Sequence, residues 1–583
     1  MRLLTKILLV LPLVFAAAFA AAQTTPFKLV IIIVQENRTP DNLFGSDAQP
    51  QPGGVRQLPG ADLAITATCN GVGNILRSPN AFETCFDPDH GHNYRLTQPY
   101  HDAWFTTYHG GKMDGACDVT LWCSVKPLKQ CPQPGCNPPT NVQLTYVDNS
   151  NGIVQPYFDI AMNYGYANYM FATNQGPSFE AHQFLFGGTS APTPSNDGKD
   201  TCYDSNNKGY PCYNWFAAEL QQAPGGTWGC PAGSGTDIVE IDSNGEEDLQ
   251  EYNSGFPCYE HNTLADLLNG NWGYYPQPPV TWPTSLWTAP NAIRHICYND
   301  STGSGNCNST VWQDNVVAKA PPNSWQQDAM APIIEDIENC NLPALSWVIP
   351  DGAWSDHAGQ GWLGPAWVAA IVNTVGGPRT NPCPNGENYW NDTVILVTWD
   401  DWGGWYDHIY PWNCKSNGTC TGYPNPDPSK SGSEYVYGFR VPLLVVSAYN
   451  KQNTQQGLPG YISGSCGNPT PPCPNNSPPY VHDFGSILAF TEYVFGLGEI
   501  DPYGYHYADY WAPDAYPSCP RTTCPFPLSD FFVSNLGNNP TPAPFVPVVL
   551  PPVFCPGGVC YDAEYFENYD GPPADPDWDA LEQ

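Results

Sequence analysis

Residues 393–408 read TVILVTWDDWGGWYDH, in which an uncharged, largely β-branched run ends at two adjacent aspartates. Such a run predicts a strand that is buried on both faces, because a half-exposed strand would alternate apolar and polar side chains. Asp400 and Asp401 follow the run directly, and open α/β sheets hold their ligands at the carboxyl ends of their strands. The stretch therefore predicts a central strand with a ligand site at its end, although an aspartate pair alone is also common in turns.

A second stretch near the other end of the chain has the same design. Residues 28–38 read KLVIIIVQENR, so an apolar run leads directly into Glu36 and Asn37. In isolation these two residues are equally suited to cap a turn or a helix. Carboxylate and amide oxygens are also the ligands that hard divalent cations prefer. We therefore expect the two strands to share one sheet, with Glu36, Asn37, Asp400 and Asp401 around a common cation or phosphate site.

Strand and helix patterns alternate along the chain, which predicts an α/β fold with a mainly parallel sheet. Residues 343–350 and 441–448 are further apolar runs and predicted strands. Helical patterns cover residues 155–164, 179–186, 263–269, 324–337, 366–375 and 484–495.

The two ligand-bearing strands must meet in space, so residues 23–536 are expected to form one large domain. Gly-, Pro-, Asn- and Cys-rich sequence at 191–257 and 414–433 predicts inserted loops. Residues 537–583 are first Pro-rich and then acidic. They are expected to form a wrapping arm followed by a loose tail.

Residues 1–22 have the pattern of an export signal. Arg2 and Lys6 precede an apolar core from Ile7 to Phe15, and small residues follow at 18–22. A membrane anchor is the alternative, but the apolar segment is short for a bilayer span, and no later segment has such an unbroken apolar run. The pattern predicts a secreted or periplasmic protein without stable membrane insertion.

Cysteine content and charge agree with export. The 22 cysteines lie mostly in close pairs among Pro, Gly and Asn, such as Cys297/Cys307 and Cys414/Cys420, and no CxxC occurs. Disulfides of open connectivity are therefore expected in place of a zinc ribbon. The net charge is −36, from 20 basic and 56 acidic residues, which disfavours nucleic acid as a partner and suits acidic surroundings. The oligomeric state is not indicated.

Four blocks, in this order, carry a resemblance to a known family. Residues 34–45 read VQENRTPDNLFG and resemble an opening block QENRSFDHYFG. Residues 176–178 and 187–190 read GPS and GGTS and resemble a nucleophile block, while residues 342–357 resemble a block LPA…PD…SDH. Residues 399–408 look like YDEHGGFYDHV. Together they are similar to the bacterial phosphoesterase family, which includes phospholipases C and acid phosphatases within the alkaline-phosphatase-like superfamily.

The resemblance implies a fold and an activity. The implied fold is an alkaline-phosphatase-like three-layer α/β/α sandwich with a mainly parallel central sheet and disulfide-clipped loop insertions. The implied phosphoesterase catalytic domain, residues 23–536, hydrolyses small-molecule or phospholipid phosphate esters. Both phospholipase C-type diesters and acid phosphatase-type monoesters are compatible. The implied cofactor is a divalent metal ion, with Ca, Mg, Mn, Fe and Zn all open.

The resemblance also assigns site residues. Ser178 is the implied nucleophile, which forms a phosphoserine intermediate, and the implied metal ligands are Glu36, Asn37, Ser178, Asp400 and Asp401. These residue types fit the chemistry, because phosphate ester hydrolysis needs a cation, an aligned nucleophile and a proton donor. Ser178 follows Gly-Pro and precedes a helical pattern, so its hydroxyl is expected at a helix N-terminus that stabilises anions. A simple helix cap is the alternative.

The histidine roles follow from the same blocks. His357, in Ser-Asp-His, and His92, in His-Asn-Tyr-Arg, are implied to contact the phosphoryl group or to protonate the leaving oxygen. His90 lies two residues from His92 and is the alternative, although the residues after His92 fit the family pattern better. His408 and His482 are left outside the predicted site.

Some positions depart from the family pattern, and two other functions compete. Pro40, Asn42 and Leu43 replace Phe, His and Tyr of the opening block, and Asp401 replaces a Glu, as in acid phosphatase members. A sulfatase-like hydrolase is disfavoured, because the Cys/Ser-x-Pro-x-Arg setting is missing around Ser178. A catalytically silent secreted binding protein that retains the fold is the alternative from a different class.

Overall fold

The computed structural model describes most of residues 25–550. Its longer gaps are 46–57, 93–102, 124–137, 191–200, 243–255, 277–285, 321–330, 423–434, 465–479 and 515–525, and shorter breaks occur elsewhere. The predicted export signal and the tail beyond residue 550 lie outside the described part.

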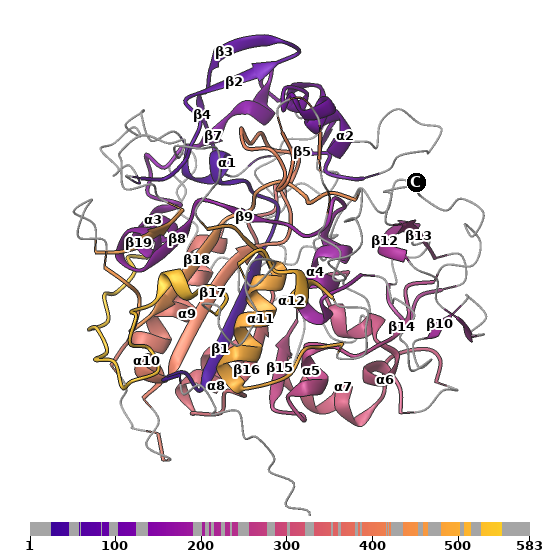
Figure 1. The fold of residues 1–583 in the computed structure, drawn as a ribbon, viewed down its shortest axis with the longest axis vertical. Coiled ribbons are helices and arrows are strands. Elements are labelled where there is room, and N and C mark those ends of the chain that lie inside the picture. The colour runs from indigo at the N-terminus through magenta and orange to yellow at the C-terminus, as the bar shows by residue number, and fades with distance from the viewer. Residues whose placement is uncertain are drawn as a thin grey trace, which may run out of the picture.

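A seven-stranded sheet forms the centre of the molecule (Figure 1). Its strands run in the order β15 (Trp272–Tyr275), β16 (Leu345–Val348), β1 (Leu29–Gln35), β17 (Thr393–Trp399), β18 (Leu443–Ser447), β8 (Gly165–Ala167) and β19 (Tyr461–Ser463). Neighbouring strands are parallel except where β18 meets β17 and β8. The prediction of a mainly parallel α/β sheet is confirmed, and the four predicted strands lie together within it.

The two ligand-bearing strands are direct neighbours. β1 and β17 pair in parallel along their whole lengths, from Leu29 opposite Thr393 to Gln35 opposite Trp399. Every residue of both strands is buried, which explains why both sequences are continuous apolar runs. Because parallel strands end at the same edge, the residues that follow Gln35 and Trp399 emerge side by side.

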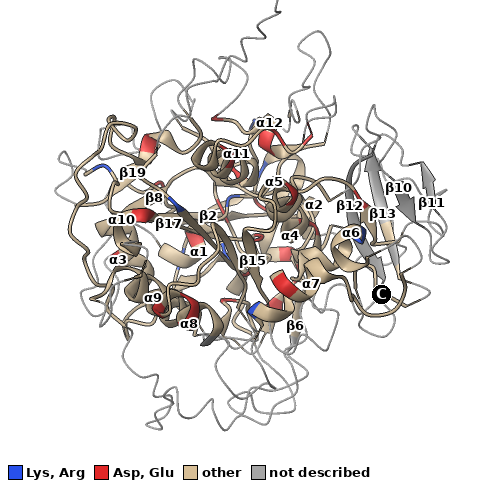
Figure 2. Ribbon diagram, turned by 90° about the horizontal axis from the view of Figure 1, so that it is seen from below, with Lys and Arg blue, Asp and Glu red and all other residues tan. Residues whose placement is uncertain are grey.

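Helices lie on both sides of this sheet. Figure 2 shows α11 (Phe484–Phe495) and α12 (Ala508–Trp511) on one side and α8 (Ala331–Glu338) and α9 (Gly364–Gly376) on the other. Apolar side chains of the helices and the sheet join one large core. The helices predicted at 366–375 and 484–495 are confirmed. Within the described part, no helix has both the length and the apolar character that a bilayer span requires.

The insertion at 191–257 is more ordered than predicted. Its described residues include two antiparallel pairs, β10 (Thr201–Tyr203) with β11 (Gly209–Pro211) and β12 (Trp215–Gln222) with β13 (Asp237–Asp242). The prediction of loops is wrong for these strands. Their apolar alternation is short and is surrounded by Gly, Asn and Cys, so turn signals dominate the sequence pattern.

Disulfides join all ten cysteines whose side chains the structure describes. Cys297–Cys307 and Cys414–Cys420 close small loops, as their spacing suggests. Three others join cysteines 28 to 48 positions apart: Cys69–Cys117, Cys230–Cys258 and Cys340–Cys383. The prediction of disulfides is confirmed for these residues, and the remaining close pairs lie outside the described part.

The described part of the C-terminal arm, residues 537–550, crosses a layer of helices. The backbone of Val546 exchanges hydrogen bonds of 2.6 and 2.9 Å with the hydroxyl of Tyr164, which caps α3 (Gln155–Asn163). The backbone of Val548 forms two more, of 2.8 and 2.9 Å, with the side chain of Asn373 in α9. This segment (yellow in Figure 1) is therefore held by side chains of the helices, together with a backbone hydrogen bond of 2.7 Å from the Ala543 amide to the Ala448 carbonyl just after β18.

Candidate active site

The ends of β1 and β17 bring Glu36 and Asp400 together. The Asp400 amide donates to the Gln35 carbonyl at 2.9 Å, and the Asn37 amide donates to Asp400 Oδ1 at 3.0 Å. Asn37 turns the chain with a left-handed φ of 59°, a conformation that Asn tolerates better than most residues. These contacts fix both carboxylates at one edge of the sheet.

The loop after Asp400 approaches Asn37 so closely that only glycine fits. Gly403 has a φ of +61°, and a Cβ built on it would lie 2.4 Å from the Asn37 carbonyl oxygen. A side chain at this position would therefore clash with backbone atoms and adopt a strained conformation. The glycine pair of the sequence block thus allows the two strand-end segments to pack against each other.

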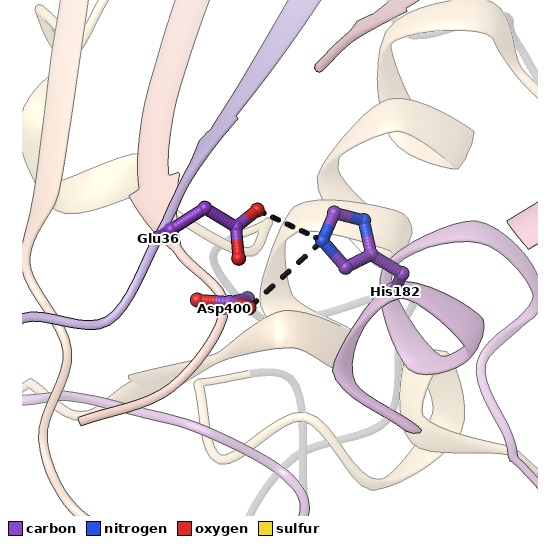
Figure 3. Close-up of side chains that lie close together, drawn as sticks. All are labelled: Glu36, His182 and Asp400. Carbon is purple, nitrogen blue, oxygen red and sulfur yellow. Dashed lines mark hydrogen bonds and ion pairs between the residues drawn. The ribbon is translucent and has the colours of Figure 1, made fainter. Parts of the chain in front are cut away.

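Helix α4 (Ser178–Gly187) supplies the other two groups of the site. Ser178 is its first residue, and its hydroxyl donates to Asp400 Oδ2 and lies 3.1 Å from Glu36 Oε2. His182 is one turn further along, and its Nε2 lies 3.2 Å from Glu36 Oε1 and 3.9 Å from Asp400 Oδ2 (Figure 3). All four side chains are buried. The structure thus brings the predicted Glu36, Ser178 and Asp400 together.

His182 is a residue of this site that sequence reasoning missed. Residues at positions i and i+4 of a helix share one face. Because Ser178 opens α4, its expected role as nucleophile already implied that His182 would face the same carboxylates. The four-residue spacing between Ser178 and His182 is the sequence feature that predicts His182 as a site residue.

The residues present fit a divalent cation. Glu36, His182 and Asp400 each offer a ligand atom, and these atoms lie within 4.8 Å of one another. Two buried carboxylates this close repel each other unless a positive charge lies between or beside them. Asn37 Oδ1 is also buried and has no hydrogen-bond partner within the described part of the chain. These buried ligand atoms would be unfavourable in a core without a cation, and they are of the types that a divalent cation binds.

Asn37 and Asp401, the other two predicted ligands, lie beside this group but make other contacts. The Asn37 side-chain nitrogen lies 2.7 Å from His90 Nε2. The Asp401 carboxylate accepts a hydrogen bond of 2.6 Å from the Gly403 amide. The carboxylate of Asp401 does not belong to the group of ligand atoms within 4.8 Å of one another. The roles of Asn37 and Asp401 as ligands stay predictions.

His357 and His90 lie around the same centre. The imidazoles of His90 and His357 are 5.8 Å apart between ring centroids. Trp287 lies between two of the site histidines, with its ring 6.5 Å from that of His182 and 6.2 Å from that of His357. The rings of His182, Trp287, His357 and His90 are therefore successive neighbours, from α4 to the histidine that contacts Asn37.

His92 has different neighbours. Its ring packs against Phe105 at 5.2 Å and Trp104 at 6.1 Å between centroids. His90, two residues earlier, is the histidine that contacts Asn37. The role of His92 stays a prediction, and the geometry favours the alternative, His90.

Asp356, next to His357, links that histidine to the sheet. Its carboxylate accepts hydrogen bonds from the Tyr157 hydroxyl at 2.8 Å and from Trp399 Nε1 at 2.9 Å. Burial raises the pKa of Asp356 to about 7, although Arg38 and these two donors act in the opposite direction. Asp356 therefore holds the segment that carries His357 against the end of β17.

A second acidic group lies under the same loop and is already neutralised by cationic side chains. Arg440 donates to both oxygens of Asp407 at 2.9 and 3.0 Å. His408 contacts Asp41 at 2.8 Å and Asp62 at 3.2 Å. Burial lowers the pKa of His408, but Asp41 and Asp62 outweigh it and raise the pKa to about 10. This network is an ion-paired support for the site loop.

Thermal stability is expected to fall as the pH rises from about 6.5 towards 10. His408 and His482 both have a pKa raised from 6.5 to about 10, against the effect of burial, by Asp41 and by Asp530 and Asp514 respectively. A raised histidine pKa contributes stability that is complete below 6.5 and is lost as the pH passes the folded-state value. Melting temperatures measured from pH 5 to pH 10 test this, and a flat or rising profile above pH 6.5 would contradict it.

Comparison with known proteins gives a consistent result. The model of the Phosphoesterase family matches residues 27–498. The chain is 26% identical over 203 residues to the hemolytic phospholipase C of Pseudomonas aeruginosa, which covers 33% of this chain and 24% of that protein. It is 25% identical over 287 residues to the non-hemolytic phospholipase C of the same organism, covering 45% and 34%.

A mycobacterial relative gives the same picture over a shorter region. Phospholipase C B of Mycobacterium tuberculosis is 29% identical over 140 residues, covering 20% of this chain and 22% of that protein. The chain thus matches about a fifth to a third of the length of these relatives. The region matched by the family model extends from before β1 to beyond α11 and contains every residue of the site. The chain belongs to the Phosphoesterase family.

Proposed function

We propose that this protein is an exported, metal-dependent phosphoesterase that acts through a phosphoserine intermediate. One observation carries the proposal: a serine hydroxyl at the start of a buried helix contacts two buried carboxylates that follow neighbouring strands. Membership of the Phosphoesterase family supports the reaction class. Helices on both sides of the sheet support an alkaline-phosphatase-like three-layer arrangement.

Ser178 is proposed as the nucleophile. Its Oγ attacks the phosphorus atom while the bond to the leaving oxygen breaks on the opposite side. Its proton moves towards Asp400, which already accepts its hydrogen bond. The helix dipole at the start of α4 stabilises the negative charge on the phosphoryl oxygens. Water then attacks the phosphoserine, releases the phosphate product and restores the hydroxyl.

A cation bound by Glu36, Ser178 and Asp400 would neutralise the carboxylates and the charge on the phosphoryl oxygens. Asn37 and Asp401 are proposed to complete its surroundings. His357 is proposed to protonate the leaving oxygen, with His90 beside it. This assignment is supported by the short path of contacting rings from His357 to the helix that carries Ser178.

The proposed substrates are phosphate esters of small molecules or phospholipids. The named relatives are phospholipases C, which favours phosphodiesters. The Asp400-Asp401 pair and the pI of about 4.3 favour acid phosphatase-type monoesters. Disulfides in the described part support export to an oxidising compartment.

Removal of divalent metal is expected to abolish turnover. The purified protein would be assayed on p-nitrophenyl phosphate and phosphatidylcholine, before and after dialysis against a chelator. We expect a loss of at least ~100-fold, reversed by added metal, because charge neutralisation by a cation contributes several kcal/mol in such sites. Asp400→Asn should not be rescued. Chelator-resistant activity would contradict metal dependence, and no turnover of either ester would favour a silent binding protein.

A further inference from the structure

His182 holds a position that the metal site proposed above does not yet use. It is 1% exposed, and its Nε2 lies 3.2 Å from Glu36 Oε1 and 3.9 Å from Asp400 Oδ2. Figure 3 shows the imidazole of α4 directed at both carboxylates from the side opposite the strands. A buried imidazole in this place either supplies a positive charge to the carboxylates or donates its nitrogen lone pair to the cation they bind.

The spacing of the donor atoms fits coordination of one ion. Two atoms bound ~2.1 Å from a common ion lie ~3.0 Å apart at a right angle and ~4.2 Å apart when opposite. The contacts of Glu36 with Ser178 Oγ at 3.1 Å and with His182 Nε2 at 3.2 Å lie at the lower end of that range. The contact of Asp400 with His182 at 3.9 Å lies near its upper end. The Ser178 hydroxyl lies closer to Asp400 Oδ2 than this range, in a hydrogen bond that a bound cation would replace. Glu36, His182 and Asp400 can therefore surround one cation without rearrangement of α4.

We propose that His182 is a nitrogen ligand of the catalytic cation, which makes the site selective for Zn²⁺ or another imidazole-binding transition ion over Ca²⁺. This inference rests on the proposed metal-dependent function. Imidazole binds zinc and other first-row transition ions well, whereas Ca²⁺ and Mg²⁺ prefer oxygen ligands. One nitrogen ligand among carboxylate and hydroxyl oxygens thus favours a transition ion over Ca²⁺ or Mg²⁺.

The helix that carries both groups gives the arrangement its rigidity. Ser178 and His182 are one turn apart on α4, so the nucleophile and the nitrogen ligand are fixed relative to each other by a single element. The helix ends at Gly188 in the left-handed conformation, and the adjoining Gly187 has the side chains of His261 and Thr263 within 3.2 Å of where its Cβ would be. A ligand on a well-packed helix is more precisely held than one on a loop.

His295 offers a matched control. Its imidazole also lies between two carboxylates, 2.6 Å from Glu260 and 2.9 Å from Asp266. It differs in being 35% exposed and in lying on α6 (Arg294–Cys297) and not on the helix that carries Ser178. A comparison of His182→Gln with His295→Gln therefore separates the loss of a site ligand from the loss of an imidazole between acids.

The test measures metal affinity, not only activity. Metal-stripped wild type, His182→Gln and His295→Gln would be titrated with Zn²⁺, Mn²⁺ and Ca²⁺ against a competing chelator. Loss of an indirect support of a metal ligand already costs 10–100-fold in affinity, so His182→Gln is expected to weaken Zn²⁺ binding by at least ~100-fold. Its Ca²⁺ affinity should change by less than ~3-fold, because glutamine keeps an oxygen donor. Equal Zn²⁺ affinity in wild type and His182→Gln would overturn the proposal.

A second measurement uses the wild-type protein alone and does not depend on the folding of a variant. Pulsed electron paramagnetic resonance of the Mn²⁺-loaded protein should show a nitrogen coupling from a directly bound imidazole. A spectrum without such a coupling would also overturn the proposal. Wild-type protein that binds none of Zn²⁺, Mn²⁺, Ca²⁺, Mg²⁺ and Fe²⁺ would instead refute the metal-dependent function itself, so the two failures are distinguishable.

Discussion

Replacing Ser178 by alanine is expected to lower kcat by at least ~10⁴-fold on every phosphate ester that the protein hydrolyses. The substitution removes the only protein atom that forms a bond to phosphorus in the proposed reaction. It also removes the hydroxyl that bridges Glu36 and Asp400. The measurement is kcat and KM on p-nitrophenyl phosphate and phosphatidylcholine, with the melting temperature recorded for each protein.

Ser309→Ala is the matched control for this substitution. Ser309 is also a buried serine at a helix start, where its hydroxyl accepts the Trp312 amide and caps α7 (Thr310–Asn315). Loss of that cap should cost about 1 kcal/mol of stability and leave kcat unchanged. Ser178→Ala with more than a tenth of wild-type kcat would remove Ser178 from its proposed role. Rapid acid quenching of wild-type protein with labelled substrate should in addition trap phosphate on Ser178.

Arg440→Met is expected to lower the free energy of unfolding by ~3–5 kcal/mol, because it leaves the buried carboxylate of Asp407 without its cationic partner. Arg440 is fully buried and forms a two-point ion pair with Asp407, and Asp41 lies 3.8 Å away. It also donates to the backbone carbonyls of Asp62 and Asn168. Urea unfolding of wild type and variant gives the difference.

Lys28→Met provides the contrast for an exposed ion pair. Lys28 Nζ lies 3.0 Å from Asp392, but 58% of the lysine side chain is exposed. Such surface pairs contribute ~0–1 kcal/mol, so this variant should unfold close to wild type. If Arg440→Met also cost less than ~1 kcal/mol, the network would not be the support of the site loop that its burial indicates.

The parts of the fold that the sequence predicts are those with long, uninterrupted patterns. β1 and β17 are continuous apolar runs because both faces are covered, and α11 spans the residues of its pattern. β8 and β19 have three residues each, too few for a period to emerge. The reversed direction of β18 is set by its connections and not by its composition, so no local pattern indicates it.

The candidate site divides in the same way. Glu36 and Asp400 each follow a strand directly, so pairing of the two strands is enough to bring them together. The side chain of His182 reaches the site only because α4 presents that face to the carboxylates. The sequence indicates this face only after Ser178 has been assigned to the site. His90 and His92 are only two positions apart in the sequence. Their spacing therefore does not predict that it is His90 whose side chain contacts Asn37.

The clasp formed by residues 543–548 has a consequence for when the molecule can mature. Tyr164, Asn373 and Trp390 come from three separate helices, yet all bond to backbone that is synthesised more than 150 residues after the last of them. These hydrogen bonds can therefore form only after residues 543–548 have been synthesised, later than any contact among the helices themselves.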